Sequence, residues 1–123
     1  LSALREAGCV FGVCTNKFER YSRKLLADLG ILGEFAAIVG GDTLSVRKPD
    51  PLHILETLRR MGASLEVAVM VGDSTNDVRA ARAAGVPVVA VSFGYTAVPA
   101  RDLGADHVID DLSELPKVLA GLP

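Results

Sequence analysis

Short apolar runs alternate with longer amphipathic segments along the chain. The apolar runs are rich in Val, Ile and Ala and are bounded by Gly, Pro or polar residues, as strands commonly are. Their continuous hydrophobicity is typical of strands that are covered on both faces. The predicted strands are residues 9–14, 35–40, 67–72, 86–92 and a shorter one at 107–110.

The segments between these runs carry apolar residues at helical spacing. In the first of them these residues are Tyr21, Leu25, Leu26 and Leu29. Pro51 stands at a first helical position, and glycines follow the ends of the segments, where helices commonly stop. The predicted helices are residues 18–30, 51–62, 76–85 and about 112–122, and residues 1–8 read as the closing turns of another.

The alternation of these elements predicts the fold class. Strands that alternate with helices of this length form right-handed β-α-β units. We therefore predict an α/β fold, a doubly wound parallel sheet with helices on both faces, in a single domain over residues 1–123. Since no N-cap precedes the first predicted helix, we expect the chain to be a fragment of a longer protein.

Composition narrows the function classes. The formal net charge is −2 and the 13 basic residues form no stripe or run, which argues against a nucleic-acid surface. No apolar run is long enough to span a bilayer and no signal peptide is recognisable, so we expect no membrane partner and a cytoplasmic location. Cys9 and Cys14 fall in one predicted strand with side chains on opposite faces, so we expect neither a disulfide between them nor a metal site.

Polar residues cluster just after the predicted strands. Thr15 and Asn16 follow the first strand, and Lys48 lies between the second strand and the next helix. Asp73 and Asp77 follow the third strand. Because the carboxyl ends of parallel strands share one edge, where doubly wound folds bind ligands, we expect a site at that edge.

Asp73 and Asp77 place two carboxylates at a strand-to-helix junction. Mg²⁺ prefers such oxygens and commonly uses one or two carboxylates together with water and substrate phosphate. Helix capping is the alternative for Asp77, since residues 74–77 are all common in first turns. For the pair alone the two interpretations are equally supported.

Thr15, Asn16 and Lys48 have the chemistry to bind an anion. A strand end ahead of a helix exposes backbone N–H groups and a hydroxyl to a phosphate oxygen. A helix N-cap is the alternative for Thr15 and Asn16. Lys48 precedes Pro49 and is therefore extended. It can bring a point charge to a phosphate or be a solvated loop lysine.

In combination, the order of these residues is specific. The stretches CTNK, IVGGDT, RKPDP, VGDSTNDVRAARAAGVPVVAVSFGY and GADHVID closely resemble the core of the haloacid dehalogenase superfamily of phosphatases, most nearly its phosphoglycolate phosphatase group. The resemblance covers essentially the whole chain. It implies a Rossmann-like core and Mg²⁺-dependent hydrolysis of phosphate monoesters of small metabolites through an aspartyl-phosphate, with phosphoglycolate as the expected substrate.

The resemblance also implies roles for single residues. Thr15 corresponds to a catalytic residue that binds the transferring phosphoryl group, and Asn16 beside it supports phosphate binding. Lys48 corresponds to a catalytic cation that neutralises the phosphate and the attacking carboxylate. Asp73 corresponds to the direct Mg²⁺ ligand, and Asp77 to the acidic partner that holds the metal or its waters. The implied partner is a small phosphorylated metabolite.

One motif of that superfamily is missing. Its nucleophile and its acid–base Asp lie in a D-x-D-G-T motif after a first central strand, and no such motif occurs here. Residues 40–44, GGDTL, carry Gly at the place of the nucleophile. The substrate-selecting cap that follows the motif is missing as well. We therefore expect this chain alone to be inactive.

The same resemblance implies that the sheet lacks its first central strand, which would lie between the strands at 9–14 and 67–72. Each of these two strands would then expose a row of unpaired backbone groups. We expect one of three consequences: a poorly stable chain, direct pairing of the two strands, or self-association through them.

Three other functions are weaker candidates. A non-catalytic phosphate- or partner-binding module would explain the missing nucleophile, but loss of catalysis should relax the metal pair, and Asp73 and Asp77 are both present. A phospho-acceptor receiver domain places its acidic residues before the Thr and Lys, which is the reverse of the order here. A dinucleotide-binding domain requires G-x-G-x-x-G after a strand, and none is present.

The remaining polar residues favour structural roles. His53 and His107 have no partner at catalytic spacing, and we interpret them as structural or exposed. Asp42 and Thr43 favour a turn over a place in the cleft. The stretch SFGY at 92–95 could face a substrate, but its glycine favours a turn.

Overall fold

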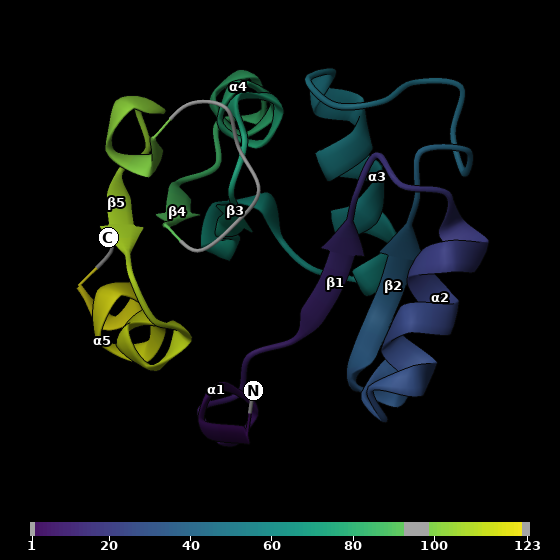
Figure 1. Cartoon of the computed structure of the whole chain (residues 1–123), viewed down its shortest axis with the longest axis horizontal. Coiled ribbons are helices and arrows are strands. Elements are labelled where there is room, and N and C mark those ends of the chain that lie inside the picture. The colour runs from purple at the N-terminus through teal and green to yellow at the C-terminus, as the bar shows by residue number, and fades with distance from the viewer. Residues whose placement is uncertain (1, 93–98, 122–123) are drawn as a thin grey trace.

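The computed structural model describes residues 2–92 and 99–121. Each predicted strand and helix is present, with ends that differ by a few residues (Figure 1). The strands are β1 (Phe11–Cys14), β2 (Phe35–Val39), β3 (Met70–Gly72), β4 (Val88–Val91) and β5 (His107–Ile109). The α-helices are α1 (Ser2–Glu6), α2 (Glu19–Asp28), α3 (Pro51–Met61), α4 (Thr75–Ala84) and α5 (Leu115–Ala120). Single 3₁₀ turns are η1 (Leu32–Glu34), η2 (Leu65–Val67), η3 (Ala100–Asp102) and η4 (Leu112–Glu114).

The strands form two separate pieces of parallel sheet. β1 pairs with β2, and β4 lies between β3 and β5. β1 and β3 are the facing edges of the two pieces, and no ladder joins them within the described residues (Figure 1). The fold is thus the predicted α/β sheet without a central strand. Direct pairing of β1 with β3, one of the three expected consequences, does not occur in this part of the chain.

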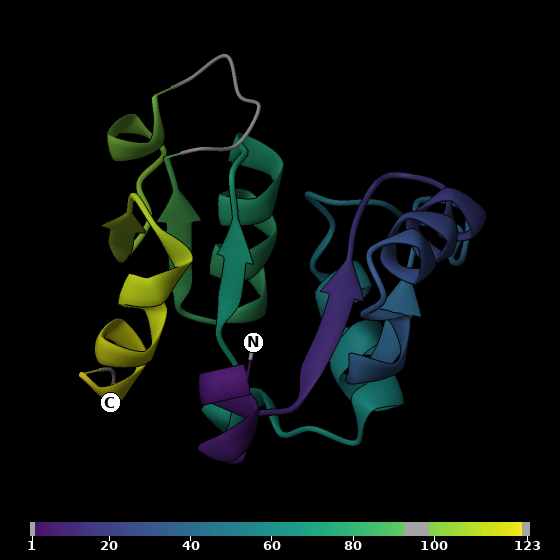
Figure 2. The ribbon, with the colours of Figure 1, turned by 60° about the horizontal axis from the view of Figure 1, so that its bottom comes forward.

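Helices cover both faces of the sheet, as predicted. All four residues of β4 are buried. Val88 and Ala90 pack into a core with α3 and α4, whereas Val89 and Val91 pack into a core with α1 and α5. Figure 2 shows α4 and α5 on opposite faces of the piece that contains β4. α3 also packs against β1 and β2, so it joins the two pieces on one face.

The ends of α3 and α4 follow their sequence signals. Pro51 is the first residue of α3, and the Asp50 side chain caps it by accepting a hydrogen bond from the Leu52 N–H at 2.9 Å. Gly62 and Gly85 end α3 and α4 with left-handed φ angles of 68° and 77°. No helix in residues 2–92 and 99–121 is both long and apolar enough to cross a membrane.

The apolar stripe of α2 is mostly uncovered, which its spacing did not predict. Tyr21, Leu25 and Leu29 are 56%, 51% and 62% exposed, and Ser22 is the buried residue of the helix. The reason is that α2 packs mainly on β2 and η1. Leu25 and Leu26 instead line the opening between β1 and β3.

Two boundaries differ from the prediction for local reasons. β3 begins at Met70, three residues late, because residues 65–67 form η2. Cys9 precedes β1 and packs in the α1–α5 core, whereas Cys14 packs in the α3–α4 core. The two cysteines are free thiols on opposite faces of the sheet.

Candidate active site

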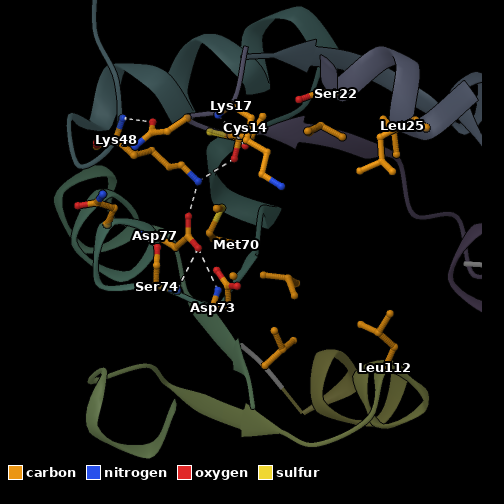
Figure 3. A pocket seen from close by; sticks show the side chains of 18 residues that line it. Cys14, Lys17, Ser22, Leu25, Lys48, Met70, Asp73, Ser74, Asp77 and Leu112 are labelled. Carbon is orange, nitrogen blue, oxygen red and sulfur yellow. Dashed lines mark hydrogen bonds and ion pairs between the residues drawn. The ribbon is translucent and has the colours of Figure 1, made fainter. Parts of the chain in front are cut away.

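A cleft of about 770 Å³ opens between the two pieces of sheet, beside the carboxyl ends of β1 and β3. The loops after these strands line it together with residues of α2 and α4 (Figure 3). It brings together every residue singled out from the sequence as a candidate site residue: Thr15, Asn16, Lys48, Asp73 and Asp77. Their roles stay predictions, but their contacts limit what each can do.

Lys48 is buried and bonded at both ends. Its ammonium Nζ donates a hydrogen bond to the Cys14 carbonyl oxygen at 2.8 Å and forms an ion pair with Asp77 (Figure 3). Its own main-chain N–H and C=O are both bonded to the Asn16 side chain. The alternative of a solvated loop lysine is therefore wrong. These two contacts use two of the three ammonium donors, which leaves one for an anion in the cleft.

Asp77 caps α4 and pairs with Lys48 at the same time. Its Oδ2 accepts hydrogen bonds from the N–H groups of Asp73 at 2.9 Å and Ser74 at 3.3 Å, and the Ser74 Oγ accepts one from the Asp77 N–H at 3.3 Å. This is a capping box, so the capping interpretation is confirmed. Oδ1 takes the Lys48 ammonium. Three groups of the protein, the N–H groups of Asp73 and Ser74 and the Lys48 ammonium, therefore anchor the side chain.

Gly72 makes room for this carboxylate. A Cβ atom built on Gly72 would lie 2.3 Å from Oδ2 of Asp77, far inside van der Waals contact. Any larger residue at this position must displace Asp77 from its cap and from Lys48. The glycine of the stretch VGDSTND is thus explained by close packing.

Asp73 is the carboxylate that faces the cleft without a fixed partner in this structure. Its side chain forms no hydrogen bond or ion pair with another residue of 2–92 or 99–121, and it is partly exposed. Those residues contain no cluster of three or more His, Cys, Asp or Glu side chains suited to a metal ion. One unpaired carboxylate, with a second beside it, fits Mg²⁺, which completes its coordination with water and substrate phosphate. This arrangement does not fit a metal ion whose ligands must all come from protein side chains.

Thr15 follows β1 directly and keeps its hydroxyl proton available. Its N–H donates to the Val39 carbonyl oxygen at 3.0 Å, which extends the β1–β2 pairing. Its Oγ1 accepts a hydrogen bond from the Lys17 N–H at 3.1 Å. The N-cap of α2 is Phe18, with no side-chain cap bond, so the N-cap alternative for Thr15 and Asn16 is wrong. The hydroxyl can donate to an anion in the cleft.

Sequence reasoning missed a hydrogen-bonded pair beneath the site, Cys14 and His53. His53 is fully buried, and its Nε2 lies 3.0 Å from the Gly40 carbonyl oxygen, which can only accept. Nε2 therefore carries the proton, and Nδ1 accepts a hydrogen bond from the Cys14 thiol at 2.9 Å. Burial lowers the pKa of His53 and raises the pKa of the Cys14 thiol. His53 is structural, as predicted; its partner is 39 residues away and no local spacing signals it.

Asp42 and Thr43 serve the turn after β2, as expected. The Asp42 carboxylate accepts a hydrogen bond from the Glu19 N–H at 2.8 Å, at the start of α2. The Thr43 Oγ1 accepts one from the Gly40 N–H at 2.8 Å and donates one to Glu19 at 2.7 Å. Hydrogen bonds from Arg23 and Thr43 hold the pKa of Glu19 below its usual value. His107 is exposed, and residues 93–95 of the SFGY stretch lie outside the described residues.

The chain matches a known family over most of its length. Residues 1–91 match the family model described as haloacid dehalogenase-like hydrolase. Among curated proteins, the chain is 50% identical over 119 residues to a phosphoglycolate phosphatase of Agrobacterium fabrum, which covers 97% of this chain and 51% of that protein. It is 49% identical over 115 residues to the phosphoglycolate phosphatase of Rhodospirillum rubrum, which covers 94% and 48%. The chain thus spans about half the length of the curated relatives it matches.

Two solved structures have a similar fold over about half of their length. A predicted phosphoglycolate phosphatase from Haemophilus somnus 129pt is similar with a TM-score of 0.89 and 31% identity, over 95% of this chain and 52% of that one. CbbY from Rhodobacter sphaeroides, solved in complex with phosphate, is similar with a TM-score of 0.80 and 29% identity, over 93% of this chain and 52% of that one.

Proposed function

Because the chain belongs to the haloacid dehalogenase-like hydrolases, we propose that it forms the phosphate- and Mg²⁺-binding part of a phosphatase site for small phosphorylated metabolites. One observation carries the proposal: the buried Lys48 ammonium lines the same cleft as the Thr15 hydroxyl and the Asp73 carboxylate. A cation, a neutral donor and a carboxylate that can take Mg²⁺ are the groups that a phosphate monoester needs.

Each of these side chains has a separate task in this proposal. Lys48 brings a fixed positive charge to the phosphoryl oxygens, where negative charge is stabilised during transfer. The Thr15 hydroxyl donates a hydrogen bond to one of these oxygens. Asp73 would hold Mg²⁺ together with water and the phosphate, and the bound ion supplies Lewis-acid polarisation of a phosphoryl oxygen. Asp77 keeps the Lys48 ammonium at the cleft.

The attacking group is not among these 123 residues, which contain no D-x-D sequence. We infer that an Asp outside this chain attacks phosphorus and that water hydrolyses the resulting aspartyl-phosphate. This chain alone then binds phosphate without turning it over. Phosphoglycolate is the proposed substrate, supported by the names of curated relatives. A reduced, cytoplasmic setting belongs to the same proposal, since both cysteines are free thiols.

Titration of the ¹⁵N-labelled chain with inorganic phosphate, followed by NMR, tests the proposal. We expect saturable shifts at the amides of residues 15–17 and 48. Thr15→Val should weaken binding without disturbing the buried ion pair, and Lys48→Met should weaken it more. Lys24→Met is the matched control, because Lys24 is exposed on α2 and pairs only with Asp28. No saturable shift, or equal loss with Lys24→Met, would contradict a phosphate site at Lys48.

The missing D-x-D sequence favours one second candidate, a non-catalytic phosphate- or partner-binding module. The two functions share the binding site and differ in turnover. Release of phosphate from 2-phosphoglycolate by the natural protein in which this chain occurs supports the phosphatase. Phosphate binding without any release by that protein supports the module.

A further inference from the structure

We propose that Asn16 is a positioning residue: it binds the main chain of Lys48 and thereby fixes where the lysine ammonium meets a phosphate in the cleft. This inference rests on the proposed function and assigns Asn16 a task different from direct phosphate binding. It predicts that Asn16 contributes to phosphate affinity only through Lys48.

The side-chain amide of Asn16 pairs with both polar main-chain groups of Lys48. Asn16 Nδ2 donates a hydrogen bond to the Lys48 carbonyl oxygen at 3.0 Å, and the Lys48 N–H donates one to Asn16 Oδ1 at 2.9 Å. The two residues are 32 apart in sequence. Both bonds have ordinary lengths, and together they satisfy the main-chain groups of a residue whose side chain is buried. We call this pair of bonds the Asn16 clamp.

Only a carboxamide can form this clamp from one side chain. It carries a donor and an acceptor side by side, whereas a carboxylate has no donor and a hydroxyl has a single atom for both tasks. Gln is one methylene longer and would have to retract. The requirement explains Asn at this position without a contact to a ligand.

The clamp completes a frame around the lysine. At the far end of the side chain, Nζ is fixed by the Cys14 carbonyl oxygen at 2.8 Å and by Asp77. Lys48 is thus tied at its ammonium to Cys14, the last residue of β1, and at its main chain to Asn16, two residues later. Thr15 lies between these two anchors. These contacts hold Lys48 against the segment that carries the Thr15 hydroxyl, and such preorganisation favours binding of a charged group.

The clamp also uses much of the hydrogen-bonding capacity of Asn16. Its Oδ1 and one Nδ2 proton are engaged at Lys48, which leaves the second Nδ2 proton for any direct contact with a phosphate. A direct contact and a positioning role therefore predict different couplings between Asn16 and Lys48.

A double-mutant cycle on phosphate affinity separates the two roles. The variants are Asn16→Ala, Lys48→Met and the double variant, each titrated with inorganic phosphate by NMR. We expect Asn16→Ala to weaken binding about fivefold or more when Lys48 is present, and less than about twofold when it is Met. Equal weakening in both backgrounds, or none in either, overturns the inference. If the unsubstituted chain binds no phosphate, the proposed function fails, and the clamp is judged by the next measurement.

Hydrogen exchange of the Lys48 amide tests the clamp without phosphate and without Lys48→Met, which can unfold the chain. We expect Asn16→Ala to accelerate exchange of this amide about tenfold or more, while the Thr15 amide, bonded to Val39, stays protected. Asn16→Asp keeps an acceptor for the Lys48 N–H and should retain part of the protection. Asn76→Ala is the matched control: Asn76 also lines the cleft, is exposed and forms no bond to Lys48. Unchanged Lys48 exchange in Asn16→Ala overturns the inference.

Discussion

The Lys48 ammonium and the Asp77 carboxylate form an ion pair that joins the two pieces of sheet across the cleft, and each side chain is only 7% exposed. Lys48 belongs to the loop after β2, and Asp77 to the first turn of α4 after β3. The other oxygen of Asp77 caps α4. One carboxylate therefore connects the start of α4, the buried Lys48 and the two halves of the core.

Asp77→Asn should reduce the free energy of unfolding by about 3–5 kcal/mol, because it leaves the Lys48 charge buried without a counter-charge. Urea denaturation followed by circular dichroism measures the loss. Asp73→Asn is the matched control: it makes the same chemical change four residues away, where the carboxylate holds no other described residue. We expect less than about 0.5 kcal/mol there. Equal losses at both positions would contradict the ion pair as the source of stability.

That the candidate residues gather at one edge could be predicted from sequence, but their contacts with one another could not. Element order alone places Thr15, Lys48 and Asp73 at one edge, because parallel strands end on the same side. The contact between Lys48 and Asp77 spans 29 residues and links two pieces of sheet, and no local pattern encodes it. Capping by Asp77 was visible, since Ser74 stands three residues earlier.

Asp77 caps a helix and also contacts a second candidate residue, whereas metal binding by Asp77 stays a prediction. Asp77 uses Oδ2 for the cap and Oδ1 for Lys48, so capping a helix does not exclude a place in the site. The apolar stripe of α2 shows a limit of prediction from sequence. Periodicity predicts which face of a helix is apolar, but not whether an element covers that face.

Stability should fall below neutral pH because of His53. Burial holds the pKa of His53 below its ordinary value of 6.5, because it outweighs the raising effect of the hydrogen bond to the Gly40 carbonyl oxygen. The charge of Lys48 lowers the pKa further, and that of Asp50 raises it by less. Below that ordinary value the unfolded chain binds a proton that the folded chain does not. The contribution of His53 is therefore present above about pH 6.5 and is lost as pH falls toward the folded-state pKa.

Urea denaturation at about pH 7.5 and about pH 5.5 measures this effect. We expect the unsubstituted chain to lose more stability between the two than His53→Gln does. His107→Gln, which changes an exposed imidazole, should keep the pH dependence of the unsubstituted chain. A His53→Gln chain with an unchanged pH dependence would contradict the assignment.

Divalent metal should bind at Asp73. Mn²⁺ takes the same oxygen ligands as Mg²⁺ and broadens nearby NMR signals. We expect Mn²⁺ with phosphate to broaden the amides of residues 72–74 first, and Asp73→Asn to weaken this effect about tenfold or more. Asp102→Asn, an exposed acidic residue of η3 that does not line the cleft, is the control. Broadening that survives Asp73→Asn would place the ion elsewhere.

The open edges of β1 and β3 and the uncovered stripe of α2 should make this chain self-associate. Unpaired strand edges and contiguous exposed apolar side chains both favour contact with another chain. Tyr21, Leu25 and Leu29 are each more than half exposed, and Leu25 also lines the cleft at the open edge of β1.

Sedimentation velocity should therefore show an average mass of this chain that rises with its concentration. Leu25→Lys should lower that mass, because it places a charge on the stripe without removing a buried contact. Leu52→Lys is the matched control, since Leu52 is similarly exposed on α3 and does not line the cleft. A monomer at every concentration, with slowly exchanging amides in both β1 and β3, would show that these edges are satisfied within one chain and would refute the association.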